Sequence, residues 1–245
     1  MNTNSNIYTI IYTTVIVVVV AGLLAAAATF LKPAQQANIK AETISQMLQA
    51  AQISTEGMNN AAKLDKYAEV IDRAFAVNAQ GAKIRDLGTS RDNIELIDGL
   101  KAQNYAIAGK DGYELALPVY MFKDGTTVIP CYGAGLWGPV WGYLAIEPDG
   151  STIKGAYFDH ESETAGLGAR IKDDPAFRAR LVGKKIAWNT DKRFEIVRGG
   201  APEGQENAID AITGATMTSR GLDAAINTWL QVYEAYFSSI KVQEE

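Results

Sequence analysis

The first 31 residues contain no Asp, Glu, Lys, Arg or His, and this charge-free segment limits what the chain can fold into. Residues 7–31 form one uncharged, mostly apolar run. An α-helix rises about 1.5 Å per residue, so about 20 residues cross the hydrocarbon core of a bilayer, and this run is long enough to span it. Tyr8 and Tyr12 are typical interfacial residues, and Lys32-Pro33 is expected to end the helix. The sequence therefore predicts a transmembrane anchor.

A cleaved signal peptide is the alternative for this segment, because Ala25–Ala28 could supply a small-residue cleavage site. Signal peptides, however, begin with basic residues and have an apolar run of about 7–15 residues. Here the basic residues are missing and the run is longer, which favours a retained anchor. Lys32 and Lys40 follow the run, so the positive-inside rule favours a cytoplasmic position for the rest of the chain.

The remainder of the chain carries all 23 basic and 28 acidic residues and excludes several classes of function. A net charge of −5, with no basic run interleaved with aromatic residues, argues against a nucleic-acid partner. A single cysteine, Cys131, excludes an intrachain disulfide and an iron–sulfur cluster with four cysteine ligands. A single histidine, His160, excludes a multi-histidine metal site. We expect no metal site, a buried Cys131 and a hydrogen-bonding surface His160, so electron transfer would require an organic cofactor.

Three helices are expected after the anchor. The first covers Ala34–Ala51 and places its apolar side chains on one face. The second is amphipathic, with apolar residues at helical spacing: Leu64, Tyr67, Ala68, Ile71 and Phe75. The third covers Leu222–Phe237, where apolar residues recur every three or four positions, with Thr218 or Ser219 as its N-cap.

Short β-like runs punctuated by glycine lie between these helices, at residues 77–81, 107–112, 119–125 and 143–150. The Asp-Gly pairs that begin at residues 111, 124 and 149 indicate hairpin turns, because glycine readily adopts positive φ. Strands bracketed by helices, without alternating βαβ units, predict an α+β fold with a mainly antiparallel sheet.

A turn rich in small and hydroxyl residues, Asp210–Ser219, leads directly into the predicted C-terminal helix. Unpaired N–H groups and the positive end of the helix dipole make such a position suitable for a phosphate. Threonine and serine are also favoured helix caps, so a purely structural turn is the alternative.

The string Asp-x-x-Thr-Gly-Ala-Thr within this turn resembles the flavinylation motif of an FMN-binding domain family. That family is shared by the NqrC subunit of sodium-translocating NADH:quinone oxidoreductases and the RnfG subunit of Rnf complexes. The resemblance implies that Thr216 carries FMN through a phosphoester bond, attached by a dedicated flavin transferase. It also implies that Asp210, Thr213, Gly214 and Ala215 form the recognition sequence, with Thr218 beside the cofactor.

A second segment, His160–Gly168, is similar to the family's Glu-Thr-Pro-Gly-Leu-Gly loop, with Ala165 in place of the usual proline. The resemblance implies that this loop lies along the isoalloxazine ring. The residues that it assigns to the flavin are Glu163, Thr164, Gly166 and Leu167. Taken alone, a Gly-x-Gly loop flanked by acidic residues is more often a plain surface turn.

The third segment, Tyr132–Gly142, places two tryptophans among four glycines. Glycine weakens strand pairing, so this composition suits a backbone that approaches a planar ligand closely. The segment is similar to the family's Gly-x-Gly-Leu-Trp pattern, which implies that Leu136 and Trp137 contact the flavin. For Trp141, filling the core is the simpler interpretation.

The resemblance runs from about Leu117 to the C-terminal helix, and the anchor fits the family's layout. It implies a transmembrane anchor (1–33), a helical and mixed connecting region (34–105) and a covalent FMN-binding domain (106–245). The implied function is an electron-carrying subunit of a sodium-pumping NADH:quinone reductase, in which no residue acts as acid, base or nucleophile. The implied partners are integral membrane subunits and the flavin transferase. The implied location is a bacterial inner membrane with the flavin domain on the periplasmic side, opposite to the side that the two lysines favour.

Two other functions remain open at the level of sequence. One is the RnfG subunit of an Rnf-type electron transport complex, which has the same covalent flavin but a different electron donor and acceptor. The other is a cofactor-free binding module tethered to the outside of the membrane, in which the threonine-rich turn only caps a helix.

Overall fold

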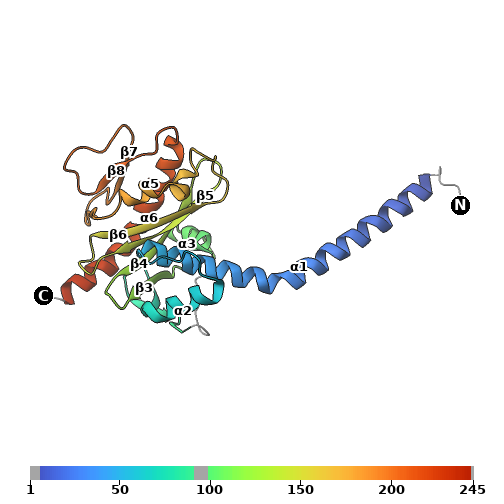
Figure 1. Ribbon diagram of the computed structural model, residues 1–245, viewed down its shortest axis with the longest axis horizontal. Coiled ribbons are helices and arrows are strands. Elements are labelled where there is room, and N and C mark those ends of the chain that lie inside the picture. The colour runs from blue at the N-terminus through green and yellow to red at the C-terminus, as the bar shows by residue number, and fades with distance from the viewer. Residues whose placement is uncertain (1–5, 91–98, 244–245) are drawn as a thin grey trace. The chain divides into compact units, whose positions relative to one another are not determined.

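The structure, a computed structural model, describes residues 6–90 and 99–243 (Figure 1). The chain forms two compact units, Met1–Glu42 and Thr43–Glu245, which are described separately. The first is helical throughout its described residues, and the second contains every strand and the other helices.

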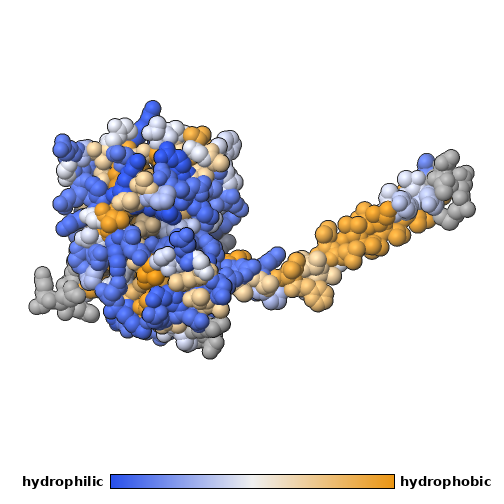
Figure 2. All heavy atoms as spheres, in the orientation of Figure 1, coloured by the Kyte–Doolittle hydropathy of each residue, from blue (hydrophilic) through white to orange (hydrophobic). Residues whose placement is uncertain are grey.

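The predicted transmembrane segment is part of a single long helix, α1 (Asn6–Ala50). The apolar side chains of the predicted transmembrane segment are exposed, with Val17 at 64% and Phe30 at 85%, and Figure 2 shows them gathered along the helix. The hydroxyls of Thr13 and Thr29 donate to backbone carbonyls one turn earlier, at 2.8 Å, which suits a medium without water. The helix is long and apolar enough to cross a membrane.

The predicted helix end at Lys32-Pro33 is wrong, because Pro33 lies inside α1 and the two helices expected there are one. A proline removes one backbone N–H and therefore one hydrogen bond. The residues around Pro33 are mostly good helix formers, including alanine, leucine, lysine and glutamine. A local loss of one bond does not stop a helix that is favoured on both sides.

A six-stranded antiparallel sheet forms the centre of the second unit, in the order β2-β1-β3-β4-β5-β6. The strands are β1 (Ile71–Val77), β2 (Lys83–Asp86), β3 (Leu117–Phe122), β4 (Thr127–Ala134), β5 (Pro139–Ile146) and β6 (Ile153–His160). Asp124-Gly125 turns the chain between β3 and β4, and Asp149-Gly150 turns it between β5 and β6, with both glycines at positive φ. The predicted α+β fold with a mainly antiparallel sheet is confirmed.

Shorter elements complete the second unit. The helices are α2 (Asn60–Val70), α3 (Leu100–Ile107), α4 (Arg170–Asp173), α5 (Pro175–Ala179) and the C-terminal α6 (Thr216–Gln243). Two three-residue strands, β7 (Glu195–Val197) and β8 (Ala208–Asp210), pair in parallel. β8 leads into the turn that precedes α6.

Two predicted elements are wrong in detail. Ile71 and Phe75 belong to β1 and not to the second helix, because the backbone becomes extended at Ile71 and pairs with β3. The β-like run at residues 107–112 is the end of α3 and a turn, in which Gly109 and Gly112 have positive φ. The Asp111-Gly112 pair therefore joins a helix to a strand and makes no hairpin.

The sheet buries both faces. On one face, Val119, Ile129 and Leu144 pack with the apolar side of α6. On the other face, residues of alternate parity such as Tyr120 and Tyr143 pack with α2 and the last turns of α1. Because β1 and β2 precede residue 106 and share this sheet with β3–β6, the expected connecting region and FMN-binding domain share one fold.

Two buried tyrosines give opposite predictions for the same substitution. Within the described part of the chain, the hydroxyl of Tyr67 is buried without a hydrogen-bond partner, whereas that of Tyr233 donates to the carbonyl of Pro118 at 2.6 Å. An unpaired buried hydroxyl costs about 1–3 kcal/mol, and a made hydrogen bond contributes about 1 kcal/mol. We expect Tyr67→Phe to raise the free energy of unfolding by about 1 kcal/mol and Tyr233→Phe to lower it by about the same amount. Urea unfolding of the full chain in detergent measures the free energy of unfolding of both variants. A loss of stability in Tyr67→Phe would contradict the assignment of the buried Tyr67 hydroxyl as unpaired.

Candidate functional site

The three glycine-rich segments singled out in the sequence meet at the N-terminal end of α6. They are the 134–138 loop between β4 and β5, the 161–168 loop after β6, and the Asp210–Thr218 segment that enters α6. Contacts at glycine positions show how closely they pack. A Cβ on Gly135 would overlap the Glu163 carboxylate, and one on Gly168 would overlap both that carboxylate and the Thr218 hydroxyl.

The Glu163 carboxylate is the point at which the three segments are joined. One oxygen, Oε1, accepts from the backbone N–H groups of Leu136, at 2.7 Å, and Trp137, at 2.9 Å. The other, Oε2, accepts from the Thr218 hydroxyl at 2.6 Å. Glu163 is only 7% exposed, so its side chain points into the protein.

The environment of Glu163 favours its charged form. Burial disfavours ionisation, but the hydrogen bonds from Thr218, Trp137 and Leu136 outweigh that effect and hold the pKa of the carboxyl below its ordinary value. The Nδ1 of His160 accepts from the Glu163 N–H at 3.1 Å. His160 thus makes a hydrogen bond, as predicted.

Thr216 is the first residue of α6 and is half-buried. The chain reaches it through Gly214, whose φ of +82° favours glycine and where a Cβ would lie 3.1 Å from Cδ2 of Leu167. Ala215 is buried, and its carbonyl accepts from the Ser219 N–H at 2.9 Å. Thr216 therefore lies in the first turn of the helix, where the N–H groups have no acceptor within the helix itself.

The predicted N-cap is wrong, because α6 begins before Thr218 and Ser219. Both are buried in its first turn, and their hydroxyls contact other segments. Thr218 donates to Glu163, and Ser219 Oγ accepts from the Ile212 N–H at 3.2 Å. These hydroxyls hold the incoming chain and the 161–168 loop to the helix.

Apolar side chains are exposed around Thr216. In the described part of Thr43–Glu245, seven large hydrophobic residues are exposed, and four belong to these three segments. They are Leu136 (48%), Trp137 (67%), Leu167 (44%) and Met217 (53%). Met217 was not predicted from the sequence, although it directly follows the motif threonine. Their concentration at one place provides an apolar surface for a planar group.

Thr164 and Gly166 lie at the exposed side of the 161–168 loop. The Thr164 carbonyl accepts from the N–H groups of Leu167 and Ala169, both at 3.1 Å, and Gly166 has a φ of +73°. The loop therefore forms a tight turn that holds Leu167 beside Gly214. Ala165, where the family has proline, is exposed in this turn.

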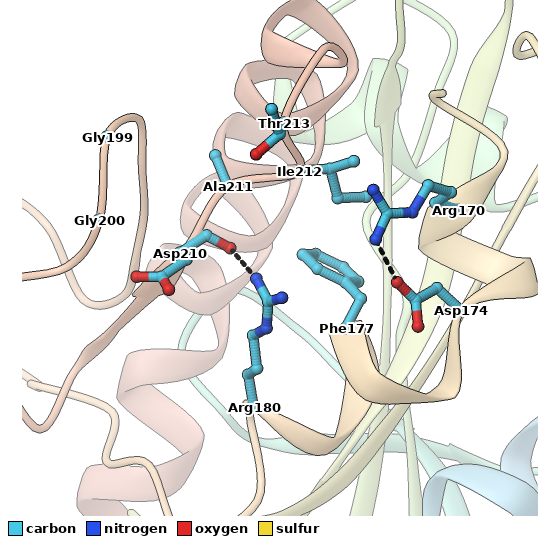
Figure 3. A pocket seen from close by; sticks show the side chains of 10 residues that line it. All are labelled: Arg170, Asp174, Phe177, Arg180, Gly199, Gly200, Asp210, Ala211, Ile212 and Thr213. Carbon is cyan, nitrogen blue, oxygen red and sulfur yellow. Dashed lines mark hydrogen bonds and ion pairs between the residues drawn. The ribbon is translucent and has the colours of Figure 1, made fainter. Parts of the chain in front are cut away.

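Asp210 and Thr213 line a pocket of about 320 Å³ beside the motif (Figure 3). Arg170 and Arg180 enter it from α4 and from the end of α5, and neither was predicted from the sequence. Arg170 is paired with Asp174 at 2.6 Å, and Arg180 donates to the Asp210 carbonyl at 3.3 Å. The Asp210 carboxylate accepts from the Ala201 N–H at 2.7 Å, so it fixes the neighbouring loop to the motif.

Two other residues singled out in the sequence lie in the sheet. Cys131 is fully buried in β4, as predicted, and burial raises the pKa of its thiol to about 12. Trp141 lies in β5 and is half-buried, so it is not enclosed in the core as the simpler interpretation held.

Comparisons with known proteins identify the family of the chain. The model of a family described as FMN-binding domain matches residues 135–231, which contain the 161–168 loop, the Asp210–Thr218 segment and all but the first residue of the 134–138 loop. The chain is 32% identical over 228 residues to the NqrC subunit of the Na⁺-translocating NADH-quinone reductase of Vibrio parahaemolyticus, covering 83% of this chain and 82% of that protein. It is also 32% identical to the same subunit of the Haemophilus ducreyi enzyme, covering 83% and 81%.

Solved structures give the same result. The crystal structure of the NqrC subunit of the Na⁺-translocating NADH-quinone reductase of Parabacteroides distasonis superposes with a TM-score of 0.70 at 32% identity, covering 85% of this chain and 97% of that chain. The crystal structure of Shewanella oneidensis NqrC gives a TM-score of 0.67 at 29% identity, covering 82% and 97%.

The lowered pKa of Glu163 predicts acid sensitivity. The unfolded chain binds a proton on this carboxyl near the ordinary value of 4.5, and the folded protein binds it only at lower pH. The stabilisation is therefore complete above that value and is lost as the pH falls through the folded pKa. We expect Glu163→Gln to lose less stability than the wild type between about pH 6 and about pH 3.5, measured by urea unfolding.

Glu161→Gln is the control for this measurement, because Glu161 is exposed two residues away. It should keep the wild-type pH dependence. An equal acid loss in wild type and Glu163→Gln would show that the Glu163 hydrogen bonds do not favour the folded state.

Proposed function

The chain belongs to the family of the NqrC subunit of Na⁺-translocating NADH-quinone reductases, and we propose that it carries one FMN joined by a phosphoester to Oγ1 of Thr216. In this proposal the protein passes single electrons between other carriers of the complex. The observation that carries the proposal is the meeting of three distant segments at Thr216, where a hydroxyl, unpaired helix N–H groups and an exposed apolar surface lie together.

The residues at the site suit each part of FMN. The N-terminal end of α6 favours a phosphate, because its N–H groups and dipole attract negative charge. Leu136, Trp137, Leu167 and Met217 offer apolar contact to a planar ring. Gly214 leaves room beside Leu167 for the chain to approach. When bound, FMN supplies the redox chemistry, and the protein's contribution is to orient it and adjust its electrostatic surroundings.

A covalent bond suits a cofactor site that is open to solvent. Trp137 is 67% exposed and Leu167 is 44% exposed, so the surface offered to the ring is not enclosed. A ligand held only by such a surface dissociates at low concentration, whereas an ester keeps the site occupied. We propose that a flavin transferase makes this bond and that it recognises Asp210, Thr213, Gly214 and Ala215 around Thr216.

We further propose that α1 anchors this domain in a bacterial inner membrane next to integral subunits. The uncharged run of α1 has no Asp, Glu, Lys, Arg or His that could line an ion pathway. Sodium movement therefore belongs to other subunits, and this chain contributes electron transfer alone. We propose that the flavin domain lies on the periplasmic side, where the flavin transferase of the family works.

Flavinylation at Thr216 is tested with a denaturing gel viewed under ultraviolet light. After coexpression with a flavin transferase, we expect a fluorescent band near 26 kDa that is absent in Thr216→Ala. Thr228→Ala is a matched control, because Thr228 is an exposed threonine of the same helix. It should keep the full fluorescence. A wild-type band without fluorescence, or an equally fluorescent Thr216→Ala band, would contradict the proposal.

The orientation of the domain is tested with reporters fused to the C-terminal end of the full chain. Alkaline phosphatase is active only outside the cytoplasm, and we expect high activity in this fusion. A cytoplasm-specific fluorescent reporter at the same position should be dark. The reverse pattern would agree with the bias of Lys32 and Lys40 and would contradict the periplasmic placement.

A further inference from the structure

We propose that Glu163 is a positioning residue that assembles the cofactor surface before any flavin is attached. Its carboxylate fastens the 134–138 loop, which carries Trp137, to the first turn of α6, which carries Thr216. The inference rests on the proposed function for the identity of the cofactor. The hydrogen bonds of Glu163 are made within the protein and need no bound flavin.

The first argument is the hydrogen bonding of the 134–138 loop. β4 ends at Ala134 and β5 begins at Pro139, so the N–H groups of Leu136 and Trp137 lie outside the strand ladder. Both donate to Glu163 Oε1. Without that oxygen, two backbone donors would lose their acceptor, and the loop that presents Trp137 would lose its attachment.

The second argument is that the site is packed for this carboxylate. There is no room for a Cβ at three glycines of the site. A Cβ on Gly135 would overlap Glu163, and one on Gly168 would overlap Thr218. A Cβ on Gly138 would overlap Ser162. The hydroxyl of Ser162 also donates to the Trp137 carbonyl at 2.8 Å. The 161–168 loop therefore holds Trp137 through both its N–H and its carbonyl, and Glu163 is the member that reaches on to α6.

The third argument concerns charge. Thr218, which binds Glu163, is two residues after Thr216 in the first turn of α6, so the carboxylate is held at the same end of the helix as the attachment hydroxyl. A negative charge at this position opposes the addition of electrons to a nearby group. Glu163 therefore also lowers the midpoint potential of a flavin on Thr216.

Two substitutions separate the effect of the Glu163 hydrogen bonds from the effect of its charge. Glu163→Ala removes the acceptor for all three donors. Glu163→Gln keeps one carbonyl oxygen for Leu136 and Trp137 and offers an amide to the Thr218 oxygen, so it retains the contacts but not the charge. Glu161→Gln removes a neighbouring exposed carboxylate and is the control for general charge effects.

The first readout is hydrogen exchange in the full chain before flavinylation. In Glu163→Ala we expect the amides of Leu136 and Trp137 to exchange at least about tenfold faster, whereas Glu163→Gln keeps them within about twofold of wild type. If Glu163→Ala does not fold, Glu163→Asp replaces it, because the shorter side chain draws the carboxylate away from the loop. Unchanged exchange in the Ala or Asp variant would overturn the positioning role.

The second readout uses the flavinylated protein. Glu163→Ala should incorporate less flavin than wild type, and Glu163→Gln should incorporate it normally but with a more positive midpoint potential. A Glu163→Gln potential equal to that of Glu161→Gln would overturn the effect of charge. A wild-type chain that takes up no flavin refutes the proposed function, while the exchange measurement still decides whether Glu163 positions the loop.

Discussion

The close packing of α6 against β4 is the constraint on which the candidate site depends. A Cβ on Gly133 would lie 2.7 Å from the Ala225 Cβ, and one on Gly221 would overlap the Ala134 carbonyl, so helix and strand approach almost to backbone contact. The Trp229 indole donates to the Tyr132 carbonyl at 2.9 Å and fixes the helix along the strand. Because β4 ends at Ala134 and α6 begins at Thr216, this packing sets the tryptophan loop beside the motif threonine.

Because of this packing, fewer loops have to become ordered when a cofactor binds. The 134–138 loop is closed by a hydrogen bond from the Gly135 N–H to the Gly138 carbonyl at 2.8 Å, and Glu163 ties it to α6. The backbone that carries the apolar side chains of Trp137 and Leu167 is thus fixed before a cofactor binds. A surface ordered in advance binds its ligand without the entropic cost of ordering loops at that moment.

Several of these features were predictable from the sequence, and others depend on distant contacts. The α+β class followed from the glycine turns and from periodicity, and the resemblance of residues 210–216 directed attention to Thr216. The orientation of Glu163 was not predictable, because its three donors lie 26, 27 and 55 residues away in the chain. Ile71 and Phe75 fit a helical period equally well, and only pairing with β3 decides that they are strand residues. The helix likewise continues through Pro33, because the helix propensity of the residues on both sides outweighs the loss of one hydrogen bond at the proline.

The buried ionisable groups at and near the site keep one charge state at neutral pH, which suits the electron carrier proposed above. Glu163, the buried carboxyl at the site, has a lowered pKa and all three of its donors in place, so its charge is constant at neutral pH. Cys131 and Tyr233 are buried with raised pKa values and remain neutral there. A group attached at Thr216 would therefore experience a fixed electrostatic field, and its potential would respond to this protein through geometry and fixed charge. The apolar run of α1 contains no Asp, Glu, Lys, Arg or His that could contribute a further charge.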